Sequence, residues 1–357
     1  MTSSRLARFA WPALWLAAVL TWAHPTRAQT TGAIAGRVVN GTAGGPAAGS
    51  GLAVVLHVTE GETELAPLQA TTDGQGGFRF EALDTDPELA YWPEVTYLDV
   101  AYSSSQSYSF AEGKTELEAA LTVYETTADD GSVRVDSVHM IAESFEQVLR
   151  ISEVHVFGNV GDRSYVGQVN EASGGKRVSV FLPVPDNAVG LAFPDDATGE
   201  RFVQVEGGIW DTQAVPPGAD TSVVRFSYHL LVEGASVPLV REFTYPVTTL
   251  NVLVVEPGLA LRGDQLLAGE PVTFQDKNYD VYQAEGLGPD TPLSIALIPS
   301  AASESTTLPS SAGTAAGALP AKQGQQEVLK WLGLGLAVLA AAGAVVYPLV
   351  TRPRTRA

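Results

Sequence analysis

The chain has 357 residues, a formal net charge of −19 at pH 7 and no cysteine. Such negative charge repels nucleic acid and anionic lipid headgroups, so the composition argues against nucleic-acid binding. The absence of cysteine excludes disulfides, thiolate metal sites, covalent haem attachment and a cysteine-linked lipid anchor. Packing must therefore supply the stability of any exported part.

The first segment, residues 1–28, has the features of a cleavable signal peptide. Arg5 and Arg8 precede an apolar run at residues 9–20, and small residues lead to a cleavage site after Ala28. We expect the protein to be exported and its mature form to begin at the following residue.

The stretch from residue 30 to residue 298 alternates short apolar segments with turns rich in Gly, Pro, Asn and Asp, and it has no sustained helical period. This pattern predicts an all-β fold. We expect two consecutive β-sandwich domains, at residues 30–112 and 119–298, both outside the membrane.

Two motifs stand out in the first domain: GAIAGRVVNGT at residues 32–42 and TTDGQGGFRFEAL at residues 71–83. In the second motif Asp73 can cap its own turn, and Phe78 and Phe80 fall on one face of the strand that follows. Both motifs resemble the carboxypeptidase regulatory-like domain, a small transthyretin-like β-sandwich of exported bacterial proteins. The resemblance implies a stalk or binding module without catalysis, because in that family this domain accompanies the catalytic domains.

The second domain resembles no family by a motif of comparable specificity. Its clearest strand is predicted from Val224 to Val232, where every second residue is apolar, as is typical of a strand with one buried face. Similar runs separated by turn clusters predict a second antiparallel sandwich. The alternative is a division into two smaller β units near residues 185–196.

The C-terminal part predicts a membrane anchor. Residues 299–327 form a linker rich in Ser, Thr, Ala, Gly and Pro, which cannot bury enough apolar surface to fold. Residues 331–350 have no charged residue and are long enough for a transmembrane α-helix. The basic tail at residues 351–357 places this end in the cytoplasm by the positive-inside rule. We expect a single-pass protein of the plasma (inner) membrane with its bulk extracytoplasmic.

Small residues recur at every fourth position of this predicted helix, at Gly333, Ala337 and Ala341, and they form a candidate helix-packing face. The alternative for the C-terminal region is a sorting signal that is removed after export. The sequence LPAKQG at residues 319–324 departs from the sortase pattern LPxTG at the threonine position, so we expect the helix to be retained.

The sequence contains no nucleophile elbow, zinc-binding helix, phosphate loop or dinucleotide fingerprint. His57 and Glu60 have the His-x-x-Glu spacing of metallocarboxypeptidases, but we interpret the match as chance because no third histidine has a suitable context. His155 and His229 have apolar neighbours and are predicted to face solvent. We expect no catalytic residue, no metal ligand and no cofactor.

Acidic pairs are frequent, among them Asp129-Asp130 and Asp195-Asp196, but none has the spacing of a dedicated calcium loop. We interpret them as solvated turn carboxylates, with bound calcium as the alternative. Aromatic residues offer another site, because flat amphipathic rings stack on sugars. The candidate ligand-contact residues are Tyr91, Trp92, Tyr97 and Tyr102, and the alternative for these four is core packing.

The sequence thus predicts a non-catalytic, membrane-anchored protein of a bacterial cell envelope that presents β-sandwich domains for contacts with a protein partner. A carbohydrate-binding surface protein with a glycan ligand is the second hypothesis. A metal-dependent enzyme with an unrecognised acidic site in the second domain is the third.

Overall fold

The computed structural model describes residues 31–61, 63–111, 113–145, 147–193, 201–256, 258–274 and 277–299. These residues are mostly β-strand, and their only helical element is a short 3-10 turn, η1 (Glu171–Ser173). The prediction of an all-β fold is confirmed for this part of the chain. None of its helices is long and apolar enough to span a membrane. The predicted signal peptide, transmembrane helix and basic tail lie outside the described residues.

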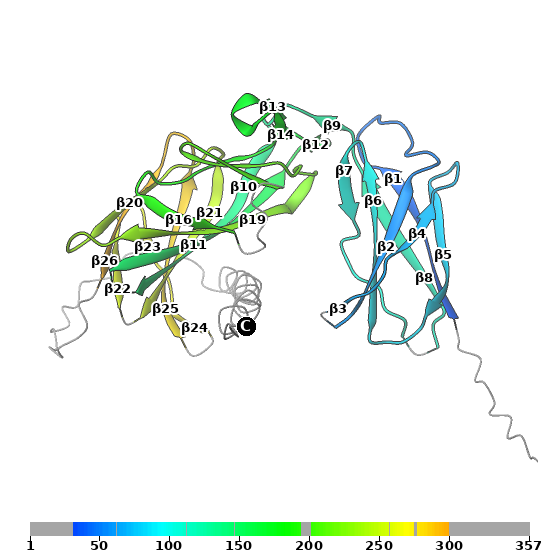
Figure 1. The fold of residues 1–357 in the computed structure, drawn as a ribbon, viewed down its shortest axis with the longest axis horizontal. Coiled ribbons are helices and arrows are strands. Elements are labelled where there is room, and N and C mark those ends of the chain that lie inside the picture. The colour runs from blue at the N-terminus through cyan, green and yellow to red at the C-terminus, as the bar shows by residue number, and fades with distance from the viewer. Residues whose placement is uncertain are drawn as a thin grey trace, which may run out of the picture.

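The N-terminal unit consists of β1 to β8 (Figure 1). The bounds are β1 Thr31–Asn40, β2 Ala53–Glu60, β3 Thr63–Glu64, β4 Leu68–Thr71, β5 Gly77–Asp84, β6 Leu89–Tyr97, β7 Val100–Ser103 and β8 Glu116–Val123. One sheet has the order β5-β1-β8, and the other has the order β3-β2-β6-β7 with β4 also paired to β2. Their apolar side chains form one buried cluster.

The turn before β5 shows how the sequence directs this unit. Asp73 Oδ1 accepts hydrogen bonds from the backbone N–H of Gln75 (2.9 Å) and Gly77 (2.7 Å). Gly76 has a φ of +80°, and a Cβ at this position would lie 2.5 Å from the carbonyl oxygen of Val38. Only glycine fits there without strain. In the strand after this turn Phe78 and Phe80 are both buried in the core, as the prediction that they share one strand face requires.

The N-terminal core extends beyond residue 112, the boundary expected from the sequence. Strand β8 pairs in parallel with β1 over its whole length, and Ala119, Leu121 and Val123 belong to the same buried cluster as Ile34. This strand completes the first unit because β1 has an open edge opposite β5.

The C-terminal unit consists of β9 to β26. The bounds are β9 Thr126–Thr127, β10 Val133–Phe145, β11 Val148–Asn159, β12 Ser164–Tyr165, β13 Gln168–Asn170, β14 Lys176–Val178, β15 Phe181–Pro183, β16 Ala188–Ala192, β17 Phe202–Val205, β18 Gly208–Asp211, β19 Gly218–Leu231, β20 Val237–Arg241, β21 Val247–Glu256, β22 Leu259–Arg262, β23 Leu267–Ala268, β24 Val272–Phe274, β25 Lys277–Leu287 and β26 Leu293–Pro299.

A large sheet dominates this unit. It has eight strands in the order β16-β19-β11-β10-β21-β25-β23, with β24 also paired to β25. Two smaller sheets, β15-β18-β17 and β20-β26-β22, contribute to the same buried cluster as the large sheet. That cluster includes Leu182 and Phe202, which lie on either side of residues 185–196. The C-terminal unit therefore has one main core.

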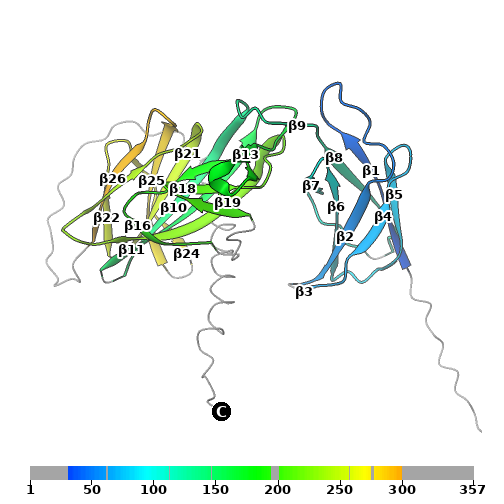
Figure 2. The same ribbon diagram turned by 45° about the horizontal axis from the view of Figure 1, so that its top comes forward.

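The two units are joined at one end, next to β9 and β12 (Figure 1), and the same connection is visible from a second direction (Figure 2). Strands β9 and β12 pair in parallel. The hydroxyl of Thr42 donates to the carbonyl of Asp162 (2.9 Å) and accepts from the N–H of Glu125 (2.8 Å). The N–H of Ser164 donates to the carbonyl of Glu125 (2.8 Å). We call Thr42, Tyr102, Glu125, Asp162 and Ser164 the junction.

Candidate functional site

Two of the four candidate aromatics lie in the N-terminal core. Tyr91 is 2% exposed, its hydroxyl donates to the carbonyl of Asp84 (2.8 Å), and its ring packs edge-on against Phe110. Tyr102 is 5% exposed, and its hydroxyl hydrogen-bonds to the carbonyl of Tyr124 (3.1 Å) and to Ser164 Oγ (2.8 Å). Neither ring has a free face for a sugar.

Tyr97 also lies close to the junction. Its hydroxyl donates to Glu125 Oε1 (2.8 Å), which accepts a second hydrogen bond from Asn40 Nδ2 (2.9 Å). The carboxylate of Glu125 raises the pKa of Tyr97 through this hydrogen bond, and burial adds to the effect. Tyr97 and Tyr102 thus help to hold the two units together. The candidate helix-packing residues Gly333, Ala337 and Ala341 lie outside the described residues.

Trp92 is the candidate aromatic that lies on an outer sheet face. Its ring stacks on the imidazole of His57, its cross-strand partner, with the centroids 5.6 Å apart and an angle of 12° between the planes. Glu64 Oε1 lies 3.2 Å from His57 Nδ1, and Glu94 Oε1 lies 4.0 Å from His57 Nε2. Glu60 is three residues from His57 and so points to the opposite face. His57 and Glu60 therefore do not form a metal-binding pair.

Acidic side chains in the described turns accept hydrogen bonds from the backbone of their own turn. Asp84 and Asp86 accept hydrogen bonds from backbone N–H groups two residues ahead, and Asp129 accepts one from Gly131 N–H. No group of three or more potential metal ligands occurs among the described residues. The pair Asp195-Asp196 lies outside them.

One group of strongly perturbed ionisable residues was not identified from the sequence. Glu153 and His155 on β11, Tyr228 on β19 and Arg241 on β20 form a buried group that we call the ionic cluster. Glu153 Oε2 accepts from Arg241 Nη2 (2.7 Å) and from His155 Nε2 (2.7 Å), and Glu153 Oε1 accepts from the Tyr228 hydroxyl (2.7 Å). All four residues are at most 4% exposed. The prediction that His155 faces solvent is wrong, because His155 lies on the face of β11 that carries the buried residues Leu149, Ile151 and Phe157.

Charge balance explains how this cluster exists in an apolar core. Burial by itself would raise the pKa of Glu153, but the Arg241 charge and the hydrogen bonds outweigh burial and hold that pKa at about 2. Burial lowers the pKa of His155 despite the bond to Glu153, so the imidazole is neutral at pH 7. Burial raises the pKa of Tyr228 well above its usual value. The cluster therefore contains one carboxylate and one guanidinium.

The geometry gives the ionic cluster a structural role. Arg241 also donates to the carbonyl of Pro183 (2.6 Å), so one guanidinium links the large sheet to β20 and β15 of the two smaller sheets. The adjoining cavity, which His155 lines, has about 10 Å³. That volume is about the size of one water and too small for an organic substrate.

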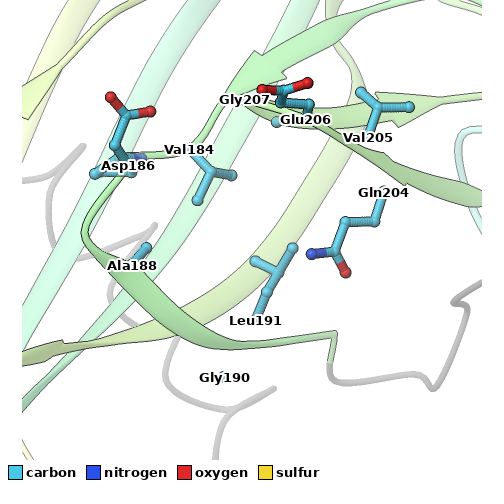
Figure 3. A pocket seen from close by; sticks show the side chains of 11 residues that line it. Val184, Asp186, Ala188, Gly190, Leu191, Gln204, Val205, Glu206 and Gly207 are labelled. Atoms are coloured by element: carbon cyan, nitrogen blue, oxygen red, sulfur yellow. The ribbon is translucent and has the colours of Figure 1, made fainter. Parts of the chain in front are cut away.

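A larger opening lies between strand edges of the C-terminal unit, and we call it the cleft. It has about 300 Å³, at the lower end of the range of ligand pockets. One side is formed by β16 and the turn before it, with Asp186, Ala188 and Leu191. The other side is the β17–β18 hairpin, with Gln204 and Glu206. Figure 3 shows these side chains on the two sides of the opening.

Both sides of the cleft are positioned by backbone contacts. The N–H of Val184 donates to the carbonyl of Gly207 (3.0 Å). Gly208 approaches β15 so closely that a Cβ would lie 2.4 Å from the carbonyl oxygen of Leu182. On the opposite side, Gly190 has a φ of +65° beside a break in the β16–β19 register. Among the described residues of the C-terminal unit the cleft is the best candidate binding site, and no local sequence motif marks it.

Comparisons with known proteins identify no family. No protein-family model and no curated protein matches the sequence. A two-domain M1 zinc metallopeptidase bound to L-tryptophan is similar at 12% identity and a TM-score of 0.27, over 47% of this chain and 43% of that one. The Bacillus anthracis TIE protein is similar at 11% identity and a TM-score of 0.18, over 74% and 48%. The chain spans less than half the length of each, and these scores support no inference about function.

Proposed function

We propose that this chain is a non-catalytic, membrane-anchored protein that presents two consecutive β-sandwich domains outside the cytoplasm for contacts with protein partners in the cell envelope. In this proposal residues 331–350 form a single transmembrane helix, and the N-terminal domain is a carboxypeptidase regulatory-like module. The proposal rests on the junction, because a presenting protein must hold its domains in a defined orientation.

The junction supplies that orientation through short-range polar contacts. Thr42 and Ser164 are 4% and 0% exposed, so their hydrogen bonds are protected from water. Asp162 also accepts from the N–H of Ala43 (3.1 Å) through its carboxylate. A buried hydrogen bond contributes about 1 kcal/mol, and leaving one partner unsatisfied costs about 1–3 kcal/mol. Several such bonds resist rotation of one unit against the other.

The test is affinity isolation of the full-length protein from cross-linked, solubilised membranes, followed by mass spectrometry. We expect a reproducible set of envelope proteins, and we expect Thr42→Val combined with Tyr102→Phe to reduce their recovery. Phe145→Ser, an exposed position away from the junction, is the matched control. Isolation of the protein alone, or protease access to the sandwiches from the cytoplasmic side only, would contradict the proposal.

Carbohydrate binding is the second candidate function, and the observation that favours it is the stacked pair of Trp92 and His57 on an outer sheet face. A half-buried indole with neighbouring carboxylates can stack on a sugar ring through its accessible part and bond the sugar hydroxyls. The test is a glycan array with the wild type, Trp92→Ala and Trp210→Ala, the last being a partly buried tryptophan elsewhere. Binding that survives Trp92→Ala would exclude this site.

A further inference from the structure

The cleft is lined by residues of β16 and β17, two strands that each have one edge without a partner strand within the described residues. Strand β16 is the terminal strand of the large sheet, and β17 is the terminal strand of the sheet β15-β18-β17. An open edge exposes backbone N–H and C=O groups that can pair with an additional strand. In Figure 3 β16 and the β17–β18 hairpin border the same opening.

The register of the β17–β18 hairpin shows which backbone groups are open. Val205 pairs with Gly208 across the turn formed by Glu206 and Gly207, and Thr212 N–H donates to the carbonyl of Arg201 (3.0 Å). Bonded pairs alternate in an antiparallel ladder. Residues 201, 203 and 205 therefore bond to β18, whereas Gln204 directs its N–H and C=O away from β18, at the free edge of β17.

The side chains around the cleft define the chemistry of a suitable ligand. Asp186 and Glu206 are exposed, and neither forms an ion pair with a basic residue in the described part of the chain. Leu191 and Val184 pack against the core and provide apolar contact surface. A basic side chain would complement the two carboxylates, and an adjacent small apolar side chain would contact Leu191.

We propose that the cleft binds an extended peptide segment of a partner protein, which adds a strand to β17 through the backbone of Gln204 and places a lysine or arginine beside Asp186 and Glu206. This inference rests on the proposed function and names the class of partner segment. The strand supplies affinity through main-chain hydrogen bonds, and the two carboxylates select the side chain.

The test is selection of nine-residue peptides from a random displayed library on the full-length protein in detergent. We expect enrichment of peptides that combine Lys or Arg with β-branched residues. Gln204→Pro removes the outward N–H without breaking the bonds to β18, whereas Gln204→Ala keeps it. We expect Gln204→Pro to weaken the selected peptide about fivefold, as the loss of one main-chain hydrogen bond predicts, and Gln204→Ala to bind like the wild type.

A second measurement leaves the protein unchanged. The selected peptide is synthesised with N-methyl groups at alternate residues, which removes its strand hydrogen bonds on one edge, and binding should be lost for one of the two methylation registers only.

Asp186→Asn with Glu206→Gln should weaken binding and reduce its dependence on salt.

Equal binding of both methylated peptides and the parent, or selection of peptides without basic residues, would overturn the inference. A library that yields nothing, while affinity isolation still recovers envelope proteins, would overturn it and leave the proposed function standing. Enrichment of library peptides, with no envelope partner recovered by affinity isolation, would contradict the proposed function and leave peptide binding by the cleft standing. Peptide-dependent pairing of two copies, measured by sedimentation, would assign the edge to self-association and also contradict it.

Discussion

Removal of Arg241 should be the most damaging single change in the C-terminal unit. The Arg241→Met variant keeps much of the side-chain volume but leaves Glu153, which is 1% exposed, without its counter-charge. Loss of one partner of a buried ion pair costs about 3–5 kcal/mol. The cost is high because the hydrogen bonds that Glu153 still accepts, from His155 and Tyr228, come from neutral donors that do not balance its charge.

This cost can be measured as a change in thermal stability. At about 2–4 °C per kcal/mol for a domain of this size, Arg241→Met should lower the Tm of the C-terminal unit by roughly 6–20 °C, followed by near-ultraviolet circular dichroism. The double variant Glu153→Leu with Arg241→Met removes both charges and should recover part of the loss, because the charge penalty disappears while the donors of His155 and Tyr228 lose their acceptor.

The control is Lys277→Met, which removes an exposed ion pair with Glu143 and should change the Tm by no more than a degree or two. If Arg241→Met and Glu153→Leu had additive effects, the two side chains would not be coupled, and the assignment of the ionic cluster would be wrong. A Tm for Arg241→Met within 2 °C of the wild type would have the same consequence.

Three other changes test separate features. Burial holds the pKa of His139 at about 4, so as the pH falls below 6.5 the unfolded chain binds a proton on this histidine before the folded chain does. The free energy of unfolding should therefore fall by about 3 kcal/mol between pH 6.5 and pH 4. His139→Gln should flatten this part of the plot of unfolding free energy, measured by urea denaturation, against pH. Gly76→Ala should destabilise the N-terminal unit by about 1–3 kcal/mol because of its positive φ and its contact with Val38, whereas Gly74→Ala, with open space around it, should cost less than 1 kcal/mol in the same assay. Tyr102→Phe removes the hydroxyl that reaches Ser164 and should cost about 1 kcal/mol, and limited proteolysis should then cleave near residue 125 faster than in the wild type, while an unchanged cleavage rate would show that this bond does not restrain the junction.

The sequence predicted correctly those features that depend on contacts between residues close together in the chain. On β19 the residues Val224, Phe226, Tyr228 and Leu230 are at most 2% exposed and their neighbours are more exposed, as the alternation predicts. The predicted turn around Asp73 is also confirmed, because an aspartate and glycines are sufficient to specify it. Both cases depend on contacts within a few residues along the chain.

The burial of His155 required information that the neighbouring residues do not contain. Leu149, Ile151 and Phe157 share a strand face with Glu153 and His155, so the period of two could have placed both polar residues inward. The opposite face of β11 carries Val154 and Val156 beside Arg150 and Ser152, which made that assignment ambiguous. The neutralising charge comes from Arg241, 88 residues further along the chain.

The extent of the N-terminal core and the position of the cleft have the same explanation. Strand β8 alternates apolar and polar residues, but its membership of the first unit follows from parallel pairing with β1. The cleft depends on the proximity of β16, which belongs to one sheet, and the β17–β18 hairpin, which belongs to another. Sheet order is set by long-range packing, and a strand pattern does not specify its neighbours.

The ionic cluster and the cleft are connected through Pro183. Arg241 binds the carbonyl of Pro183 at the end of β15, and the next residue, Val184, borders the cleft and bonds to Gly207 of the hairpin. The guanidinium therefore fixes the backbone from which one wall of the cleft begins. It follows that Arg241→Met should weaken peptide binding at temperatures where the C-terminal unit is still folded, while the double variant with Glu153→Leu should regain part of the stability without regaining affinity, because it restores the charge balance but not the bond to Pro183.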